Sequence, residues 1–128
     1  MARYDKYNPF SGGFRAPLAA NWLDADVAVP VGVGLNANGR IVKGAGNTGI
    51  VGVIVIDSKG KVAGTVVDTM TAGEIVDCTG LTAGTTYYIN DTTGALETAA
   101  PAAGVNKVLA GRTVEAQRLV VQVQRAQG

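Results

Sequence analysis

The sequence predicts a single, mainly β domain, a small β-barrel or β-sandwich, with an extended segment at its N-terminus. Its 128 residues suffice for one domain and are too few for two ordinary ones. The hydrophobic fraction of 47%, largely Ala and Val, is enough to form a core. Short β-branched stretches separated by turn residues every 8–12 residues are typical of a sandwich or barrel.

Residues 1–24 are predicted to be the extended N-terminal arm, and residues 25–128 the β domain. The first 20 residues contain four of the seven aromatic side chains, together with two prolines and a Gly-Gly pair that oppose a helix. Such a segment suits packing against a partner or, alternatively, folding across its own domain. For Trp22, packing in the core is the alternative to a contact role. The candidate contact residues are Tyr4, Tyr7, Phe10, Phe14, Arg15 and Trp22.

Residues 27–35 form the first predicted strand. Branched side chains at every second position, from Val27 to Leu35, predict one inward face. Pro30 lacks the N–H that a ladder uses, so we expect this strand at a sheet edge or with a bulge. The Asn-Gly pair at 38–39 predicts a hairpin turn into a second strand, Arg40–Lys43.

The continuous apolar run Ile50–Ile56 predicts a strand that is buried on both faces. A turn at Asp57–Gly60 leads into a predicted strand over Lys61–Val67. Only residues 19–25 and 114–119 could hold a helical turn. The remaining predicted strands lie at Gly73–Cys78, Thr85–Ile89, around Leu96, at Lys107–Thr113 and at Leu119–Val123.

Several classes of site are excluded or disfavoured by the composition. The chain has no His, which excludes His-based triads, metal sites and pH switches. The single Cys78 excludes an internal disulfide and is expected to be a small buried hydrophobe. Gly44–Gly49 matches the dinucleotide-binding pattern G-x-G-x-x-G, but a β-branched run follows it where a helix would be needed. We therefore expect no cofactor and no catalytic residues.

The acidic residues show no spacing of a metal-binding loop, so we expect no metal site. They are Asp57, Asp68, Glu74 and Asp77. The net charge of +1 does not favour nucleic-acid binding. The chain shows no secretory signal and no apolar run near the ~20 residues that span a bilayer, so we expect no membrane association and synthesis in a cytoplasm.

Charge is distributed unevenly along the chain. Residues 1–20 have three basic side chains against one acidic, and residues 98–128 have four against one. Residues 57–97 have two basic side chains against six acidic. Ordinary solvated surface explains this, or else a head-to-tail contact between a basic and an acidic face of two subunits.

A series of turn-linked strands in fixed order resembles the small capsid decoration proteins of tailed bacteriophages, also called cement or head-stabilisation proteins, particularly those of actinobacterial phages. The resemblance covers roughly residues 27–124. The stretches that carry it are Val29–Lys43, Gly49–Val53, Ala72–Val76, Gly80–Ile89, Thr93–Leu96 and Leu119–Val123.

The resemblance implies a non-enzymatic virion protein with a β-tulip-like fold, bound to the outer surface of the expanded capsid at capsomer junctions. Its partners would be the major capsid protein and further copies of itself, commonly as a homotrimer. It would stabilise the head against the pressure of packaged DNA. Deleting residues 1–20 would then leave the β domain folded but unable to bind. Two alternatives stay open: another virion β module, such as a tail or head–tail joining component, and a small-ligand-binding β domain.

Overall fold

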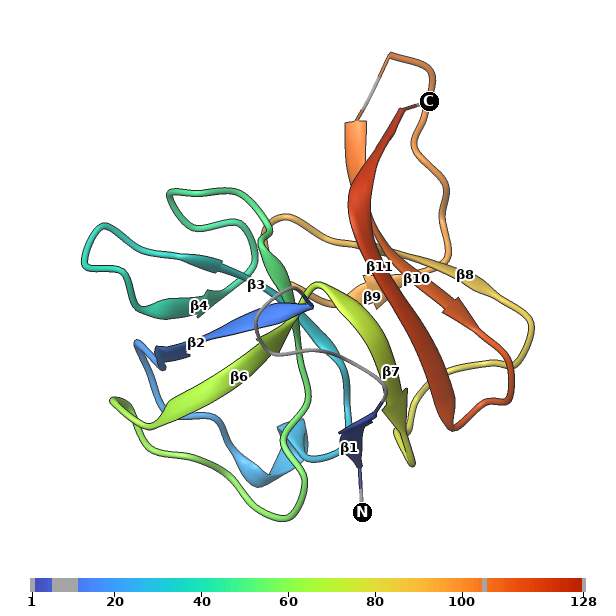
Figure 1. Cartoon of the computed structure of the whole chain (residues 1–128). Coiled ribbons are helices and arrows are strands. Elements are labelled where there is room, and N and C mark those ends of the chain that lie inside the picture. The colour runs from blue at the N-terminus through green and yellow to red at the C-terminus, as the bar shows by residue number, and fades with distance from the viewer. Residues whose placement is uncertain (1, 6–11, 105, 128) are drawn as a thin grey trace.

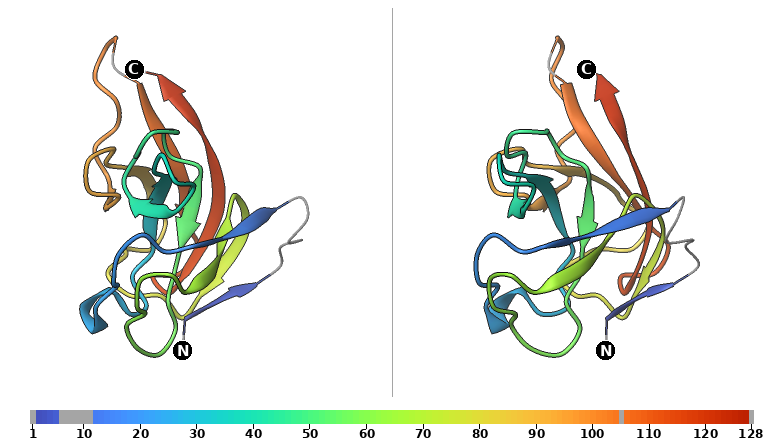
Figure 2. Two further views of the ribbon diagram at one scale, coloured as in Figure 1. Left: turned by 90° about the vertical axis from the view of Figure 1, so that its left-hand side faces the viewer. Right: turned by 60° about the vertical axis from the view of Figure 1, so that its left-hand side comes forward.

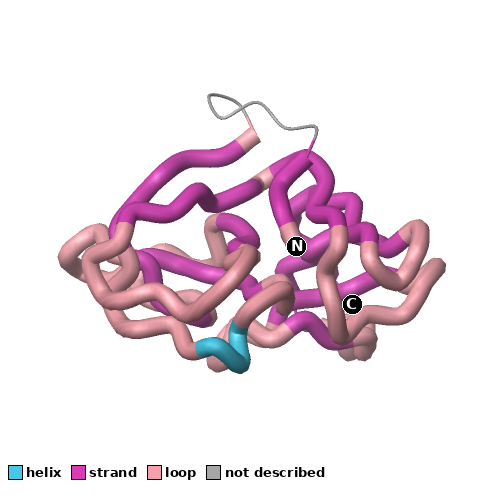
Figure 3. The backbone as a smooth tube through the Cα atoms, turned by 90° about the horizontal axis from the view of Figure 1, so that it is seen from below, coloured by secondary structure: helices cyan, strands magenta, loops and turns pink. Residues whose placement is uncertain are grey.

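The chain forms two antiparallel β-sheets that pack against each other as a β-sandwich (Figure 1). The computed structural model describes residues 2–5, 12–104 and 106–127. The predicted fold class, mainly β, is confirmed, and the sheets do not close into a barrel. Figure 3 shows strands throughout the described chain and one short helical turn, η1 (Asp24–Asp26).

The larger sheet has six strands in the order β1-β7-β11-β10-β8-β9. Its ladders are antiparallel, and a bulge between Leu109 and Gly111 interrupts the pairing of β10 with both neighbours. The start of β10 and the end of β11 pair only with each other and project as a two-stranded ribbon beyond the rest of the sheet (Figure 1). The strands are β1 (Arg3–Asp5), β7 (Ala72–Val76), β11 (Arg118–Gln127), β10 (Asn106–Thr113), β8 (Thr86–Ile89) and β9 (Leu96–Glu97).

The smaller sheet has five strands in the order β2-β6-β5-β3-β4. After β2 the chain crosses to the opposite edge, where Leu18 makes a parallel bridge to Ile41 of β4. This single bridge brings the two edges together without a continuous ladder. The strands are β2 (Gly13–Pro17), β6 (Val66–Met70), β5 (Gly52–Ile54), β3 (Val31–Leu35) and β4 (Ile41–Lys43).

The apolar run around β5 separates two cores, because successive side chains of a strand point to opposite faces. Val53 and Val55 join a core between the sheets, which includes residues from both. Ile54 and Ile56 join a second core on the other face of the smaller sheet, with Leu18. The prediction of a strand buried on both faces is confirmed, since these four β5-region side chains are at most 5% exposed.

At Gly32 of β3 the backbone of the smaller sheet lies close to a side chain of the larger sheet. A Cβ at this position would lie 2.2 Å from Cγ2 of Ile89, on β8 of the other sheet. Any larger side chain at this position would therefore push the sheets apart.

The sequence predicts that Pro30 places β3 at a sheet edge or beside a bulge, and the structure contradicts this prediction, since β3 is an interior strand with regular pairing. β3 pairs with β4 on one side and with β5 on the other. The strand begins at Val31, so the missing N–H of Pro30 falls just before the ladder. The predicted hairpin turn is confirmed: Asn36 Oδ1 accepts hydrogen bonds from the N–H groups of Asn38 and Arg40.

Two further boundaries differ from the predictions. The strand expected over Lys61–Val67 begins only at Val66, because Gly64 has a φ of +88° that breaks the extended backbone. The helical turn η1 falls at the end of the predicted 19–25 interval, with no helix at 114–119. The Gly44–Gly49 segment is a loop between β4 and β5, as expected for a glycine-rich connection.

The described part of the N-terminal segment belongs to both sheets. β1 pairs with β7 and β2 pairs with β6, so the segment follows the consecutive strands β7 and β6 in the reverse direction (Figure 2). Ala2, Leu18 and Trp22 are buried in the two cores. The described residues of 1–24 therefore take the alternative arrangement, folded across their own domain, and the packing does not separate residues 1–24 from 25–128.

Candidate functional site

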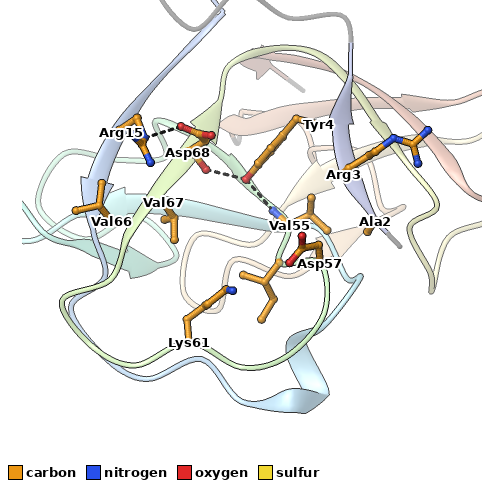
Figure 4. A pocket seen from close by; sticks show the side chains of 11 residues that line it. Ala2, Arg3, Tyr4, Arg15, Val55, Asp57, Lys61, Val66, Val67 and Asp68 are labelled. Carbon is orange, nitrogen blue, oxygen red and sulfur yellow. Dashed lines mark hydrogen bonds and ion pairs between the residues drawn. The ribbon is translucent and has the colours of Figure 1, made fainter.

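A groove opens between β1, the edge strand of the larger sheet, and β6 of the smaller sheet, and it is the candidate functional site (Figure 4). β6 and β7 are separated only by Thr71, where the chain passes from one sheet into the other. β2 and β1 follow these two strands and diverge with them. The resulting groove has a volume of about 260 Å³ and contains side chains from both edges.

The floor of the groove is fixed by Tyr4 of β1. Its hydroxyl donates a hydrogen bond of 2.7 Å to the backbone carbonyl of Asp68 and accepts one of 3.2 Å from the N–H of Val55. Figure 4 shows the ring reaching from β1 across to the backbone of Asp68, on β6, and of Val55, just after β5. Tyr4 therefore ties the edge of one sheet to the interior of the other.

The rim of the groove carries exposed ion pairs. Arg3 lies 2.9 Å from Asp77, and Arg15 of β2 lies 2.9 Å from Asp68. The two arginine side chains are 64% and 66% exposed, so these pairs contribute little to stability and stay accessible to a partner. Lys61 adds a further cation at the lower end of the groove (Figure 4).

Both edge strands have a side without a strand partner among the described residues. β1 pairs only with β7, and β2 pairs only with β6. The outer N–H and C=O groups of a sheet edge can accept an added strand from another chain. Arg3 and Arg15 stand beside this edge, each paired with a carboxylate of the same chain.

The structure places some of the predicted contact residues at this edge. Tyr4 lies in the groove floor, Phe14 is half-buried in β2, and Arg15 is exposed on the rim. Tyr7 and Phe10 lie outside the described residues.

Trp22 takes the core role that the sequence offered as the alternative to a contact role. Its side chain is 3% exposed in the second core, and Lys43 Nζ lies 4.9 Å above its ring. Lys43 is in turn paired with Asp26 at 2.7 Å. Because the indole is covered, Trp22 contributes packing and a cation–π contact rather than surface for a partner.

Sequence reasoning missed the partners of the basic residues. The N-terminal cations pair with the acidic middle of the chain through Arg3–Asp77 and Arg15–Asp68. The C-terminal cations do so through Arg118–Glu74 and Lys107–Glu97. The uneven distribution of charge along the sequence was the signal that could have indicated these pairs. In the structure, the basic ends of the chain pair with its acidic middle within one molecule.

The other kinds of functional feature to consider in the described residues are a metal site, a membrane-spanning helix and a reactive cysteine. Residues 2–5, 12–104 and 106–127 contain no group of three potential metal-ligating side chains. Within the same ranges, no helix has the length and apolar character needed to cross a membrane. Cys78 is 1% exposed, which confirms the predicted buried hydrophobe, and burial raises the pKa of its thiol.

Comparison with known proteins identifies a shared fold. A solved protein chain from Mycobacterium phage Patience superimposes with a TM-score of 0.76 and 19% sequence identity, covering 99% of this chain and 98% of the phage chain. No protein-family model matches the sequence, and no curated protein matches it. The two-sheet architecture is therefore common to both chains from end to end, despite low identity.

Proposed function

We propose that this chain is a structural protein of a bacteriophage virion that binds the outer surface of the expanded capsid. The observation that carries the proposal is the fold shared over nearly the whole length of both chains with a protein of Mycobacterium phage Patience. The resemblance of the turn-linked strands to capsid decoration proteins narrows the role to head stabilisation at capsomer junctions.

The groove between β1 and β6 supplies a physical means of binding. An extended segment of the major capsid protein would add to the open edge, while Arg3 and Arg15 select acidic or polar neighbours of that segment. A ligand that binds only the expanded lattice stabilises that lattice by mass action. Copies held together as a homotrimer would gain avidity from several weak contacts. The proposed role involves no enzymatic reaction.

Co-sedimentation with phage heads tests the proposal. The purified full-length chain would be mixed with undecorated heads of its phage, as compact procapsids and as expanded shells. We expect saturable binding to expanded shells alone. Equal binding to both forms would contradict recognition of the mature lattice. Binding to purified tails instead would support a tail or head–tail joining role.

A matched pair of variants tests the edge itself. Arg15→Ala removes an exposed rim cation, and Arg112→Ala removes an exposed cation from β10, away from the groove. We expect Arg15→Ala to weaken shell binding several-fold and Arg112→Ala to leave it unchanged. Where the unmodified chain binds shells, equal binding by both variants would exclude this edge as the contact surface.

A further inference from the structure

Three polar side chains from neighbouring strands meet on one face of the larger sheet. Ile89, the last residue of β8, pairs with Val108 of β10, so Asn90 follows opposite Lys107. Glu97 of β9 pairs with Tyr88, two residues before Asn90. Because side chains two positions apart share a face of a sheet, Asn90, Glu97 and Lys107 project to the same side.

The carboxylate of Glu97 connects the other two groups. Lys107 Nζ donates a hydrogen bond of 2.9 Å to Glu97 Oε1, and Asn90 Nδ2 donates one of 3.5 Å to Glu97 Oε2. An amine, a carboxylate and an amide nitrogen are thus joined in one chain of hydrogen bonds. The carboxylate is placed to accept a proton from the amine and to deliver one to the amide nitrogen.

The amide oxygen of Asn90 is held by two backbone donors. Asn90 Oδ1 accepts hydrogen bonds from the N–H groups of Thr92 at 2.9 Å and Thr93 at 3.1 Å. Only the oxygen of an amide side chain can accept, so these bonds fix which way the amide points. Two N–H groups directed at a carbonyl oxygen are the arrangement that stabilises negative charge during acyl transfer.

We propose that Lys107 and Asn90 become joined by an isopeptide bond, with Glu97 transferring the protons. Glu97 takes a proton from the Lys107 ammonium group, and the freed lone pair of Nζ forms a bond to Cγ of Asn90. The C=O electron pair moves to Oδ1, where the N–H groups of Thr92 and Thr93 bind it.

Collapse of this intermediate restores the carbonyl and breaks the Cγ–Nδ2 bond. Nδ2 receives a proton from Glu97 and leaves as ammonia, while Nζ returns a proton to the Glu97 carboxylate. Ammonia then takes up that proton in solvent. The net change converts a lysine ammonium and an asparagine amide into an isopeptide and ammonium, so no oxidant, reductant or cofactor is required.

The reaction is expected to be slow and irreversible. The hydrogen bond from Lys107 lowers the pKa of Glu97, so the ion pair is the resting state and the reactive neutral pair is a minor species. The side chains of Lys107 and Glu97 are 23% and 33% exposed, so released ammonia escapes into solvent. Loss of ammonia prevents the reverse reaction, so cross-linked chains accumulate with time.

Intact mass spectrometry of the full-length chain, fresh and aged for days, measures the reaction. We expect ageing to produce a species lighter by one ammonia, about 17 Da. Lys107→Arg abolishes this species, because arginine retains the positive charge beside Glu97 but stays protonated. Glu97→Gln slows its formation, and Lys59→Arg, at an exposed lysine elsewhere, leaves it unchanged. An aged chain that keeps its full mass overturns the proposal.

Proteolysis locates the bond. Cleavage of the denatured, aged chain after Glu97 separates Asn90 from Lys107, so fragments 75–97 and 98–115 stay together only if an isopeptide joins them. A succinimide at the exposed Asn38-Gly39 turn would cause the same mass loss. It would leave these fragments separate and would persist in Lys107→Arg. Separate fragments, or a mass loss that persists in Lys107→Arg, overturns the proposal. These results do not depend on the proposed virion role.

Discussion

The hydroxyl of Tyr4 occupies the place of a sheet hydrogen bond at Asp68. Val53 pairs with Met70 where β5 meets β6, so two residues further along the same register Val55 would lie opposite Asp68. The N–H of Val55 and the carbonyl of Asp68 instead bind the two sides of the Tyr4 hydroxyl. β1 thereby completes a ladder of the sheet to which it does not belong.

Replacing Tyr4 by Phe removes the hydroxyl and leaves both backbone groups without this partner. We expect Tyr4→Phe to lower the free energy of unfolding by about 1–3 kcal/mol, the cost of unsatisfied polar groups in a partly buried site. Urea unfolding measures the change. Tyr88→Phe, on the half-exposed face of β8, is the control and is expected to change stability by under about 0.5 kcal/mol. Equal effects of the two variants would contradict the bridging role.

Truncation of the N-terminal segment is expected to disrupt the domain. The sequence favoured a chain that stays folded without residues 1–20, but these residues supply β1, β2 and the fully buried Leu18. Leu18→Ala alone is expected to cost about 2–5 kcal/mol, and deletion of residues 1–20 to abolish cooperative thermal unfolding. Circular dichroism follows both. A deletion that unfolds at the temperature of the full chain would show that β1 and β2 are dispensable.

The strands were predictable from sequence because their signals are local. Alternation of branched residues identified β3, and the apolar run identified β5 with its two buried faces. Their neighbours were not predictable in the same way. Whether Pro30 leads into an edge strand or an interior strand depends on which distant segments pair with β3, and no local pattern encodes that.

The candidate site was only partly predictable for the same reason. The aromatic and basic residues of the N-terminal segment drew attention to Tyr4 and Arg15. The partner of Tyr4 lies 64 residues away, on a strand whose register had to be known first. Trp22 was grouped with the aromatic residues of the N-terminal segment as a candidate contact residue. Its backbone bridge to Lys61, which no local pattern indicates, holds it in the core.

Thr69 offers a test in which a polar group is removed. Its side chain is 0% exposed on β6, and its hydroxyl has no hydrogen-bond partner among the described residues. Thr69→Val replaces the hydroxyl by a methyl group of similar size. We expect the free energy of unfolding to rise by about 1 kcal/mol in urea titrations, because the folded state no longer contains an unsatisfied hydroxyl. A loss of stability would show that the hydroxyl is satisfied in solution.

Gly32 and Ile89 are expected to be energetically coupled across the two sheets. Gly32→Ala places a methyl group against Ile89 and is expected to cost about 1–3 kcal/mol through overpacking. Adding Ile89→Ala removes the obstructing atoms. The double variant should therefore be more stable than the sum of the single losses predicts. A double-mutant cycle from urea unfolding measures the coupling, and strict additivity would contradict direct contact.

Cys78 is expected to report global opening of the sandwich. Its side chain is 1% exposed between the sheets, and burial raises the pKa of the thiol above its ordinary value of 9.0. A thiol reagent at neutral pH should therefore label the folded chain slowly and the urea-unfolded chain rapidly, since the thiolate is the reactive form. The rate in the native state should fall in variants that stabilise the fold and rise in Tyr4→Phe.

The raised pKa of Cys78 also determines how the free energy of unfolding changes at alkaline pH. Between the unfolded and the folded pKa of Cys78, the unfolded chain has released the thiol proton and the folded chain retains it. Stability is thus fully present below the unfolded pKa and declines as pH rises through this interval. Cys78→Ala should show a smaller loss of unfolding free energy over the same alkaline range. Identical pH dependence of the two chains would mean that the thiol ionises equally in both states.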